Sequence, residues 1–293
     1  MVATRWCEPS ELEYVDLPDP EPGSDQVLVE TRAIGCNFPD ILMVQGKYQI
    51  KPPLPFSPGH EIAGIVRAVG AQVTDVRAGQ RVLANLEWGG YAERAVTAAQ
   101  RVHPIPDAMP FDQAAAFFVV YQTGYSALVR RAALQPDEWL LVHGAAGGVG
   151  LAAVQLGKAL GARVIAAAGT PEKLEVARQS GADVLIDYRT EDWIEQVKAV
   201  TGGEGADVVY DPVGGDIFDG STKCIAFEGR LLTIGFAGGR IPTVAVNRLL
   251  LKNISVVGVH WGYYQRRGSP LVQEWTDALM KLYGEGRLRP VIY

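Results

Sequence analysis

The chain has 293 residues, of which 48% are hydrophobic and 20% charged, which is enough apolar material for two domain cores rather than one. The net charge of −6 leaves no basic face to neutralise a phosphate backbone, so we expect no nucleic-acid partner. No stretch approaches the roughly 18 uninterrupted apolar residues of a membrane span, and residues 1–9 lack the pattern of a secretion signal. We therefore expect a cytoplasmic protein with no membrane contact.

Up to about residue 110, the sequence predicts a mostly β domain. Short strand-like segments alternate there with turn clusters at residues 18–23 and 52–59, which are rich in proline and glycine. We expect strands over residues 26–34, 61–70, 80–83 and 91–96.

From Phe111 onward, apolar strands alternate with helices, a pattern typical of βαβ units and a parallel sheet. Thr170-Pro171 and Ser269-Pro270 each place a capping hydroxyl before a proline, which indicates the start of a helix. We expect strands over residues 139–143, 163–168, 184–187, 207–210, 230–234 and 255–259. The sequence therefore predicts an α/β fold that follows a mostly β domain.

A glycine-rich loop, residues 144–150, follows the first of these strands and precedes an apolar helical segment. Gly147 would let the backbone approach a pyrophosphate, Gly150 would allow close helix–strand packing, and the free N–H groups at the helix start would face the anion. Ala145 stands where the dinucleotide fingerprint has its first glycine, so a tight turn without a ligand is the alternative. The residues expected to contact the cofactor here are Ala146, Gly147, Gly148, Val149 and Gly150.

The choice of nucleotide depends on the end of the next strand. An Asp or Glu about 20 residues past the loop would bind the ribose 2′-hydroxyl of NAD, but the strand ends in small residues and Gly169. The hydroxyl of Thr170 and the ammonium of Lys173 follow, and Tyr188 is a candidate wall of the same pocket. These residues favour the 2′-phosphate of NADPH. The alternatives are a solvated helix lysine at Lys173 and an ordinary strand-end tyrosine at Tyr188.

Four further motifs accompany the glycine loop, namely Gly35-Cys36-Asn37-Phe38-Pro39-Asp40, Gln45-Gly46-Lys47-Tyr48, Pro58-Gly59-His60-Glu61 and Gly89-Gly90-Tyr91-Ala92-Glu93. With these motifs, essentially the whole chain resembles the quinone oxidoreductase branch of the medium-chain dehydrogenase/reductase superfamily, the branch of zeta-crystallin-like proteins. The resemblance implies a GroES-like substrate domain, expected over residues 1–112, and a Rossmann NADPH-binding domain over 113–262. A return segment toward the substrate domain would span 263–293. It also implies a cleft between the domains and commonly a homodimer.

Zinc-dependent members of that superfamily hold a catalytic zinc with Cys, His and Cys. The matching positions here are Asn37, His60 and Val119, and one surviving ligand cannot hold zinc tetrahedrally. We therefore expect a zinc-free protein in which His60 is a structural, hydrogen-bonded histidine, and a zinc alcohol dehydrogenase is the weaker alternative. The cysteines are odd in number and far apart, so we expect reduced, buried thiols rather than disulfides.

The resemblance also assigns residues to the reaction. Asn37, Asp40 and Tyr48 match positions that line the active-site cleft, and Thr123 matches one that meets the nicotinamide carboxamide. Asn37 could instead cap a turn, and Asp40 could begin a helix. Two loops that match the border of the nicotinamide follow the expected strands, where parallel sheets bind ligands. These loops contain Val213 and Phe236.

The activity that the resemblance implies is hydride transfer from NADPH to a quinone or an α,β-unsaturated carbonyl compound. The oxyanion formed on a quinone needs hydrogen-bond donors such as Asn37 and Tyr48, whereas an enone or enoyl thioester also needs a proton. Tyr48 resembles the proton-donating tyrosine of related enoyl thioester reductases, and a purely packing role for its ring is the alternative. The alternative functions are an enoyl thioester reductase and a crystallin-like nucleotide-binding protein with little turnover.

Residues 289–293 end the sequence where members of this branch usually continue through another helix and a strand. Those elements complete the substrate domain and can add a basic residue near the cofactor phosphate. The resemblance thus puts the stability of that domain, and part of the expected NADPH contact, in question.

Overall fold

Five strands in the first part of the chain pair into one antiparallel sheet, in the order β4-β1-β2-β3-β5. Alternating residues of these strands, among them Val27, Val29 and Val82, are buried in one apolar cluster, as expected for half-buried strands. The predicted strand at 91–96 begins three residues later, and β5 was not predicted. The bounds are β1 (Gln26–Gly35), β2 (Glu61–Val69), β3 (Arg81–Asn85), β4 (Arg94–Ala98) and β5 (Val102–Pro104).

Short helices accompany this sheet. Asn37 precedes the first α-helix, in which Pro39 occupies the first turn and the side chain of Asp40 accepts a hydrogen bond from the Asn37 backbone N–H. The helical segments are η1 (Pro9–Glu11), α1 (Phe38–Val44), η2 (Ala99–Arg101) and α2 (Phe111–Ala115).

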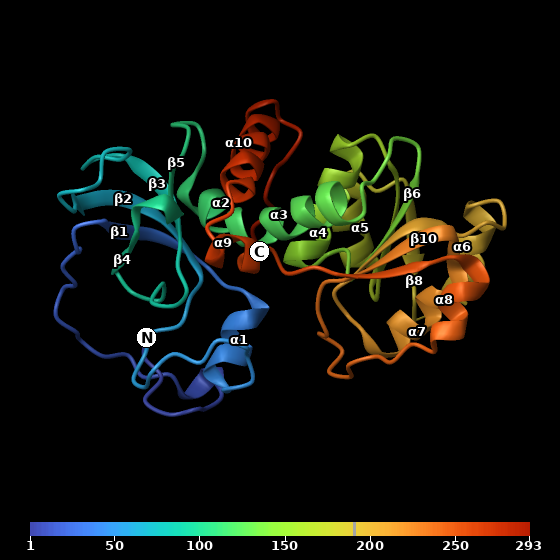
Figure 1. Ribbon diagram of the computed structural model, residues 1–293, viewed down its shortest axis with the longest axis horizontal. Coiled ribbons are helices and arrows are strands. Elements are labelled where there is room, and N and C mark those ends of the chain that lie inside the picture. Colours follow the sequence, from blue (N-terminus) through green and yellow to red (C-terminus); the bar gives the residue numbers. More distant parts are fainter. Residues whose placement is uncertain (190–191) are drawn as a thin grey trace. The chain divides into compact units, whose positions relative to one another are not determined.

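Six parallel strands form the second sheet, in the order β11-β10-β9-β6-β7-β8. The predicted bounds of β6, β7 and β8 are confirmed, while β9 and β10 are longer than predicted. Figure 1 shows helices packed beside this sheet, as βαβ connections require. The strands are β6 (Trp139–His143), β7 (Arg163–Ala168), β8 (Val184–Asp187), β9 (Ala206–Asp211), β10 (Ile225–Thr233) and β11 (Ser255–Gly258).

The helices around the parallel sheet begin largely where the sequence predicts. Thr170 caps its helix by accepting a hydrogen bond from the Lys173 backbone N–H, at 3.2 Å. Ser269-Pro270 precedes a helix that begins one residue later, at Leu271. The helices are α3 (Phe118–Tyr125), the π-helical turn η3 (Ser126–Arg131), α4 (Gly148–Ala159), α5 (Pro171–Gln179), α6 (Trp193–Val200), α7 (Gly215–Cys224), α8 (Val246–Lys252), α9 (Trp261–Arg266) and α10 (Leu271–Gly284).

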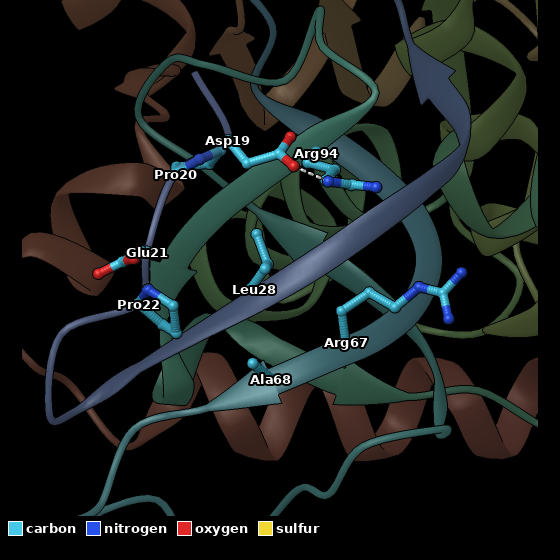
Figure 2. Close-up of a pocket in the computed structure, with 8 residues that line it drawn as sticks. All are labelled: Asp19, Pro20, Glu21, Pro22, Leu28, Arg67, Ala68 and Arg94. Carbon is cyan, nitrogen blue, oxygen red and sulfur yellow. Dashed lines mark hydrogen bonds and ion pairs between the residues drawn. The ribbon is translucent and has the colours of Figure 1, made fainter. Parts of the chain in front are cut away.

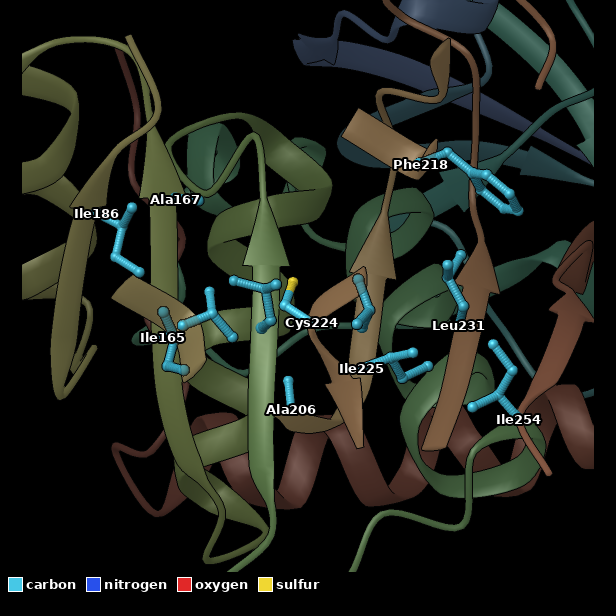
Figure 3. Close-up of a cluster of buried hydrophobic side chains, with 12 residues drawn as sticks. Ile165, Ala167, Ile186, Ala206, Phe218, Cys224, Ile225, Leu231 and Ile254 are labelled. Carbon is cyan, nitrogen blue, oxygen red and sulfur yellow. The ribbon is translucent and has the colours of Figure 1, made fainter. Parts of the chain in front are cut away.

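The core of this half lies between the sheet and its helices. Figure 3 shows Ile165, Ile186 and Leu231 from three different strands in one cluster with Phe218 of α7. All four side chains are at most 3% exposed, so this layer contributes hydrophobic stabilisation to the sheet.

The structure is a computed structural model that describes residues 1–189 and 192–293. Residues 1–119 and 291–293 form one compact unit, called unit 1, and residues 120–290 form a second, called unit 2. One unit built on an antiparallel sheet and one built on a parallel sheet flanked by helices agree with the predicted α/β fold class. No helix within the described ranges is both long and apolar enough to cross a bilayer.

The cysteines correct one expectation. Cys224 is buried, but Cys7 is half-buried and Cys36 is exposed, so the prediction of three buried thiols is wrong. Cys36 lies between the end of β1 and the start of α1, where the chain leaves the sheet and its side chain turns outward.

Candidate functional site

The glycine loop connects β6 to α4 at the carboxyl edge of the parallel sheet. Gly144 takes a positive φ of 56°, and Gly147 becomes the N-cap of α4 with its nitrogen bonded to the Gly144 carbonyl at 2.9 Å. The first N–H groups of a helix have no intrahelical acceptor, so the start of α4 presents donors and the positive end of the helix dipole. Gly147 and Gly148 are exposed there, which fits the approach of an anion.

Gly150 and Gly147 have different reasons to be glycine. A Cβ on Gly150 would lie 2.2 Å from the Gly144 carbonyl oxygen and 2.8 Å from the Cα of Ala145, so the helix and the loop pack in direct contact. A Cβ on Gly147 would meet only the Gly144 carbonyl oxygen, at 3.3 Å. The fold therefore requires glycine at position 150, because the loop leaves no room for a side chain there. The space beside Gly147 is instead open to a ligand.

The predicted 2′-phosphate residues gather at the ends of β7 and β8. A Cβ on Gly169 would lie 3.1 Å from the hydroxyl of Tyr188, so the tyrosine lies directly against the glycine that follows β7. Thr170 caps α5, and Lys173 lies exposed in its first turn. In the described ranges, no acidic side chain forms an ion pair with Lys173. Gly169 leaves room for a phosphate ester, and the side chains of Thr170, Lys173 and Tyr188 carry groups that can donate hydrogen bonds to it. This set suits a phosphate ester better than a ribose hydroxyl.

Two charged residues at this corner were not singled out from the sequence. Arg189 follows Tyr188 and is exposed, and its charge helps to hold the pKa of Glu172 below the ordinary carboxyl value, after the hydrogen bonds from the Glu172 backbone and from Thr170. Glu172 lies in the first turn of α5, past the end of β7, rather than at the strand end itself. The corner thus carries two cations and two carboxylates, because Arg189 also pairs with Asp187 at the end of β8, at 3.7 Å.

The two loops predicted to border the nicotinamide also start at the carboxyl edge. Val213 follows β9, and Phe236 follows β10 with 36% of its surface exposed. A Cβ on Gly144 would lie 3.6 Å from a methyl carbon of Val213, so the loop after β9 touches the glycine loop. Thr123 is buried on α3 rather than on this edge.

Unit 1 contains a buried polar cluster around Asp40, whose side chain is only 4% exposed. Its carboxylate accepts a hydrogen bond from His60 Nδ1, one from the Tyr91 hydroxyl at 3.2 Å and one from the Asn37 backbone N–H at 2.8 Å. Burial, together with the neighbouring charge of Asp40, raises the pKa of Tyr91 well above its usual range. Asp40 therefore orients the side chains of His60 and Tyr91. It also lies in the first turn of α1, as the alternative for this residue predicts.

Glu61 is the second buried carboxyl of this cluster. It accepts hydrogen bonds from the Asn37 amide at 2.8 Å and from the Val119 backbone N–H at 2.9 Å. Burial raises the pKa of Glu61 to about 8, although the bonds from Val119 and Asn37 oppose the shift. At neutral pH the carboxyl is therefore mostly protonated.

Tyr48 follows α1 and is half-buried. Its ring meets the ring of His60 edge-on, with centroids 5.8 Å apart, which joins it to the cluster of Asn37 and Asp40. The Nε2 atom of His60 is buried and has no hydrogen-bond partner among the described residues. His60 is thus hydrogen-bonded as expected, through one ring nitrogen only.

The donor set does not fit a catalytic zinc. Asn37 offers an amide that is bonded to Glu61, Val119 offers no side-chain ligand, and His60 is bonded through Nδ1 to Asp40. Across residues 1–189 and 192–293, no three His, Cys, Asp or Glu side chains are grouped closely enough to hold a metal ion. The hydrogen bonds from Asn37 and Val119 go instead to the buried carboxyl of Glu61, and that from His60 goes to Asp40.

Two hollows lie on unit 1. Figure 2 shows one of about 460 Å³, beside the ion pair of Asp19 with Arg94; none of the predicted site residues lines it. A groove of about 820 Å³ has a mainly apolar lining that includes Ile34 and Trp88, and it reaches Cys36 and Tyr91. Through Tyr91, this groove adjoins the polar cluster.

Sequence reasoning missed Glu61 and Tyr91 as site residues, although both lie in motifs that carry the family resemblance. No spacing rule relates them to Asn37 and Asp40, because the hydrogen bonds join residues that are 24 and 51 positions apart. An acid at the first position of a predicted apolar strand was the available signal for Glu61.

Comparisons with known proteins agree with this geometry. The alcohol dehydrogenase GroES-like domain family matches residues 23–107, and the zinc-binding dehydrogenase family matches residues 148–282. A quinone oxidoreductase-like protein 2 homolog of Nematostella vectensis is 43% identical over 269 residues, which are 91% of this chain and 73% of that protein.

Solved structures agree as well. Escherichia coli quinone oxidoreductase complexed with NADPH has a TM-score of 0.91 at 34% identity, over 100% of this chain and 90% of that one. The CurK enoyl reductase has a TM-score of 0.87 at 28% identity, over 97% of this chain and 87% of that one. The chain belongs to the zinc-free quinone oxidoreductase branch of the medium-chain dehydrogenase/reductase superfamily, and it is an oxidoreductase of that type.

Proposed function

We propose that the chain transfers a hydride from NADPH to a small electron-poor acceptor, a quinone or an α,β-unsaturated carbonyl compound, without zinc. The observation that carries the proposal is the edge of the parallel sheet. There, the open N-terminus of α4 lies next to a strand end where Gly169, Thr170, Lys173 and Tyr188 meet. This is where a dinucleotide with a 2′-phosphate binds in such folds, and solved relatives of this chain are complexes with NADPH.

Each part of the edge has a role in holding the cofactor. The backbone N–H groups of Gly148 and Val149 would bind the pyrophosphate, and Lys173, Thr170 and Tyr188 would bind the 2′-phosphate. Thr123, Val213 and Phe236 would bind the nicotinamide half. When bound, NADPH supplies the hydride, and the protein supplies orientation and electrostatics.

Unit 1 offers the groups that an acceptor needs. The Asn37 amide carries two N–H groups, of which Glu61 takes one, so the second is able to stabilise a developing oxyanion. The Tyr48 hydroxyl is the proposed proton donor for an enone or enoyl thioester. The apolar groove that reaches Cys36 and Tyr91 suits the body of an uncharged acceptor.

Enoyl thioester reduction is the second candidate, because the CurK enoyl reductase shares the fold and Tyr48 resembles a proton donor. A panel of simple quinones, enals and enoyl thioesters, assayed with NADPH and with NADH on protein analysed for metal, tests the proposal. We expect NADPH oxidation with at least one class of acceptor and no stoichiometric zinc. Saturable NADPH binding without turnover on any acceptor would instead indicate a crystallin-like nucleotide-binding protein.

We also propose that the chain forms a homodimer through β11 and α8. Strand β11 lies at an edge of the parallel sheet, and Val246, Leu250 and Leu251 of the adjoining α8 are 75–76% exposed. An open edge beside exposed large apolar side chains is costly in water and typical of an interface. Light scattering during size exclusion should give the mass of a dimer, and Leu250→Asp with Leu251→Asp should give that of a monomer. An unchanged mass in the double variant would exclude this surface.

A further inference from the structure

The loop after β9 depends on a buried carboxylate that has no part in the proposed function. Asp211 is the last residue of β9 and is 1% exposed. Its Oδ1 atom accepts hydrogen bonds from two consecutive backbone N–H groups, those of Val213 at 2.8 Å and Gly214 at 2.9 Å. One oxygen atom therefore fixes the direction in which the chain leaves the strand.

The conformation held in this way is one that only glycine adopts readily. Gly214 has φ 72° and ψ −155°, and a Cβ there would lie 3.0 Å from the Phe236 ring and 3.2 Å from the Arg240 carbonyl oxygen. Without the two bonds to Asp211, a glycine at this position would have many accessible backbone conformations.

The same loop is bonded to the loop that follows β10. The N–H of Ala237 donates to the Pro212 carbonyl at 3.0 Å, and that of Gly238 donates to the Val213 carbonyl at 2.9 Å. In the other direction, the N–H of Gly215 donates to the Arg240 carbonyl at 3.0 Å. The two loops therefore form one hydrogen-bonded body. The Asp211 side chain ties the first loop to β9, and the Asp211 backbone carbonyl accepts the N–H of Ile234, before the second loop, at 2.9 Å.

A buried carboxyl such as that of Asp211 is costly at a purely structural position. Burial raises the pKa of its carboxyl, and the N–H groups of Gly214 and Val213 only partly oppose the shift. Arg240, the nearby cation of the second loop, is instead bonded to Asp216 and Asp219 on α7. A carboxyl held by backbone N–H groups without a cation is stabilised only while those groups stay in place.

The two loops lie where a sheet of this kind binds its ligand. Strand β9 lies between β6 and β10, and the chain order along the sheet reverses between β6 and β9. Ligands of such sheets bind outside the carboxyl ends of the strands at that reversal. The loop after β9 adjoins the glycine loop there, because a Cβ on Gly144 would lie 3.5 Å from the Pro212 ring.

We propose that Asp211 is a positioning residue, which holds the loops at residues 212–215 and 235–240 in the arrangement that receives the nicotinamide half of the cofactor. The proposal rests on the proposed function, because it takes from that function the site of the nicotinamide. It adds that the two halves of the cofactor site are set independently. The adenosine half depends on β7, β8 and α5, and the two loops of the nicotinamide half depend on one carboxylate at the end of β9.

The test compares Asp211→Ala and Asp211→Asn in the full chain. Asparagine keeps an oxygen that accepts both N–H bonds, whereas alanine removes it. Two ligands are titrated by calorimetry: NADPH, and 2′,5′-ADP, which carries only the adenosine half. Amide hydrogen exchange at Val213 and Gly214 reports on the loop without any ligand. Asp207→Ala is the matched control, because Asp207 accepts the Trp139 N–H at 2.7 Å near the opposite end of the same strand.

We expect Asp211→Ala to exchange the two amides at least about tenfold faster and to bind NADPH about tenfold more weakly, the loss of one or two hydrogen bonds. Its affinity for 2′,5′-ADP should stay within about twofold of the wild type. Asp211→Asn should restore both NADPH affinity and amide protection, and Asp207→Ala should leave the NADPH affinity unchanged.

The outcomes separate the two proposals. Equal weakening of NADPH and 2′,5′-ADP in Asp211→Ala, or unchanged amide exchange, would overturn the positioning role while the proposed function stands. A wild-type protein that binds neither ligand would overturn the proposed function and the positioning role with it.

Discussion

The glycine loop of unit 2 and the Asp40 cluster of unit 1 are held in place in different ways. The glycine loop is shaped by its own backbone, through the positive φ of Gly144 and the contact of Gly150 with the same loop. The Asp40 cluster depends on side-chain bonds that join Asp40 to His60 and Tyr91. The first arrangement is local in the sequence and independent of pH, whereas the second depends on distant segments and on protonation.

The largest expected effect concerns the glycine loop. Gly147→Val should fold but lose NADPH binding, because its Cβ meets no protein atom closer than 3.3 Å and fills space that is open to the pyrophosphate. Gly150→Val should fail to fold, because its Cβ would lie 2.2 Å from a backbone oxygen. Circular dichroism and an NADPH titration separate the two outcomes.

Gly284→Val is the control, since a Cβ on that glycine meets nothing within 4 Å. Normal NADPH binding by folded Gly147→Val would show that the phosphate is held elsewhere.

The second effect concerns the Asp40 cluster and has the opposite character, because it depends on pH. The folded pKa of Glu61, about 8, lies above the ordinary value of 4.5, so the folded state retains a proton that the unfolded state loses in between. The stability that this group contributes is present below pH 4.5 and is lost as pH rises to 8, by on the order of 4 kcal/mol.

Glu61→Gln should therefore flatten the decline in the stability of unit 1 between pH 5 and 8, as measured by denaturant unfolding. Glu93→Gln, on the surface of the same unit, is the control and should leave the decline as it is. A decline of equal size in Glu61→Gln and the wild type would mean that Glu61 ionises normally.

The contrast explains what the sequence could and could not predict. The bounds of β6, β7 and β8 and the cap at Thr170 follow from local patterns of apolar residues, glycine and proline, and they are confirmed. The roles of Glu61, Tyr91 and Asp211 do not follow from local patterns, because each depends on which N–H or O–H groups the fold brings to a buried oxygen. The prediction that Cys36 is buried was wrong for the same reason, because it rested on the residue type alone and not on the contacts that the fold brings to it.

A smaller effect is expected at Tyr48, where the cluster meets the proposed chemistry. Tyr48→Phe keeps the ring that lies against His60 and removes only the hydroxyl. Turnover of an enone or enoyl thioester should fall by about 10², the size of a general-acid contribution, and quinone turnover should fall much less. Steady-state kinetics on both acceptor classes measure the difference, with Tyr14→Phe at an exposed tyrosine as the control. Full activity of Tyr48→Phe on every unsaturated carbonyl compound would leave the ring with a packing role alone.

The smallest effect is expected at the 2′-phosphate corner, where Lys173 is exposed in the first turn of α5. Lys173→Ala should raise the KM for NADPH by about tenfold and leave the KM for NADH unchanged. This is the lower end of the roughly 1.5 to 3 kcal/mol of one charge-assisted contact, because the lysine is exposed. Lys281→Ala, at an exposed lysine of α10, is the control. An equal rise for both cofactors would remove Lys173 from the phosphate site.

The central claim is that this chain carries out hydride transfer from NADPH rather than nucleotide binding alone. It is tested most directly by NADPH deuterated separately at each of the two hydrogens on nicotinamide C4, consumed with an acceptor that the protein reduces. We predict a primary isotope effect from one of the two deuterated forms only, because the loops around Val213 and Phe236 would hold the ring with one face toward the acceptor. Saturable NADPH binding with no acceptor-dependent oxidation would contradict the claim.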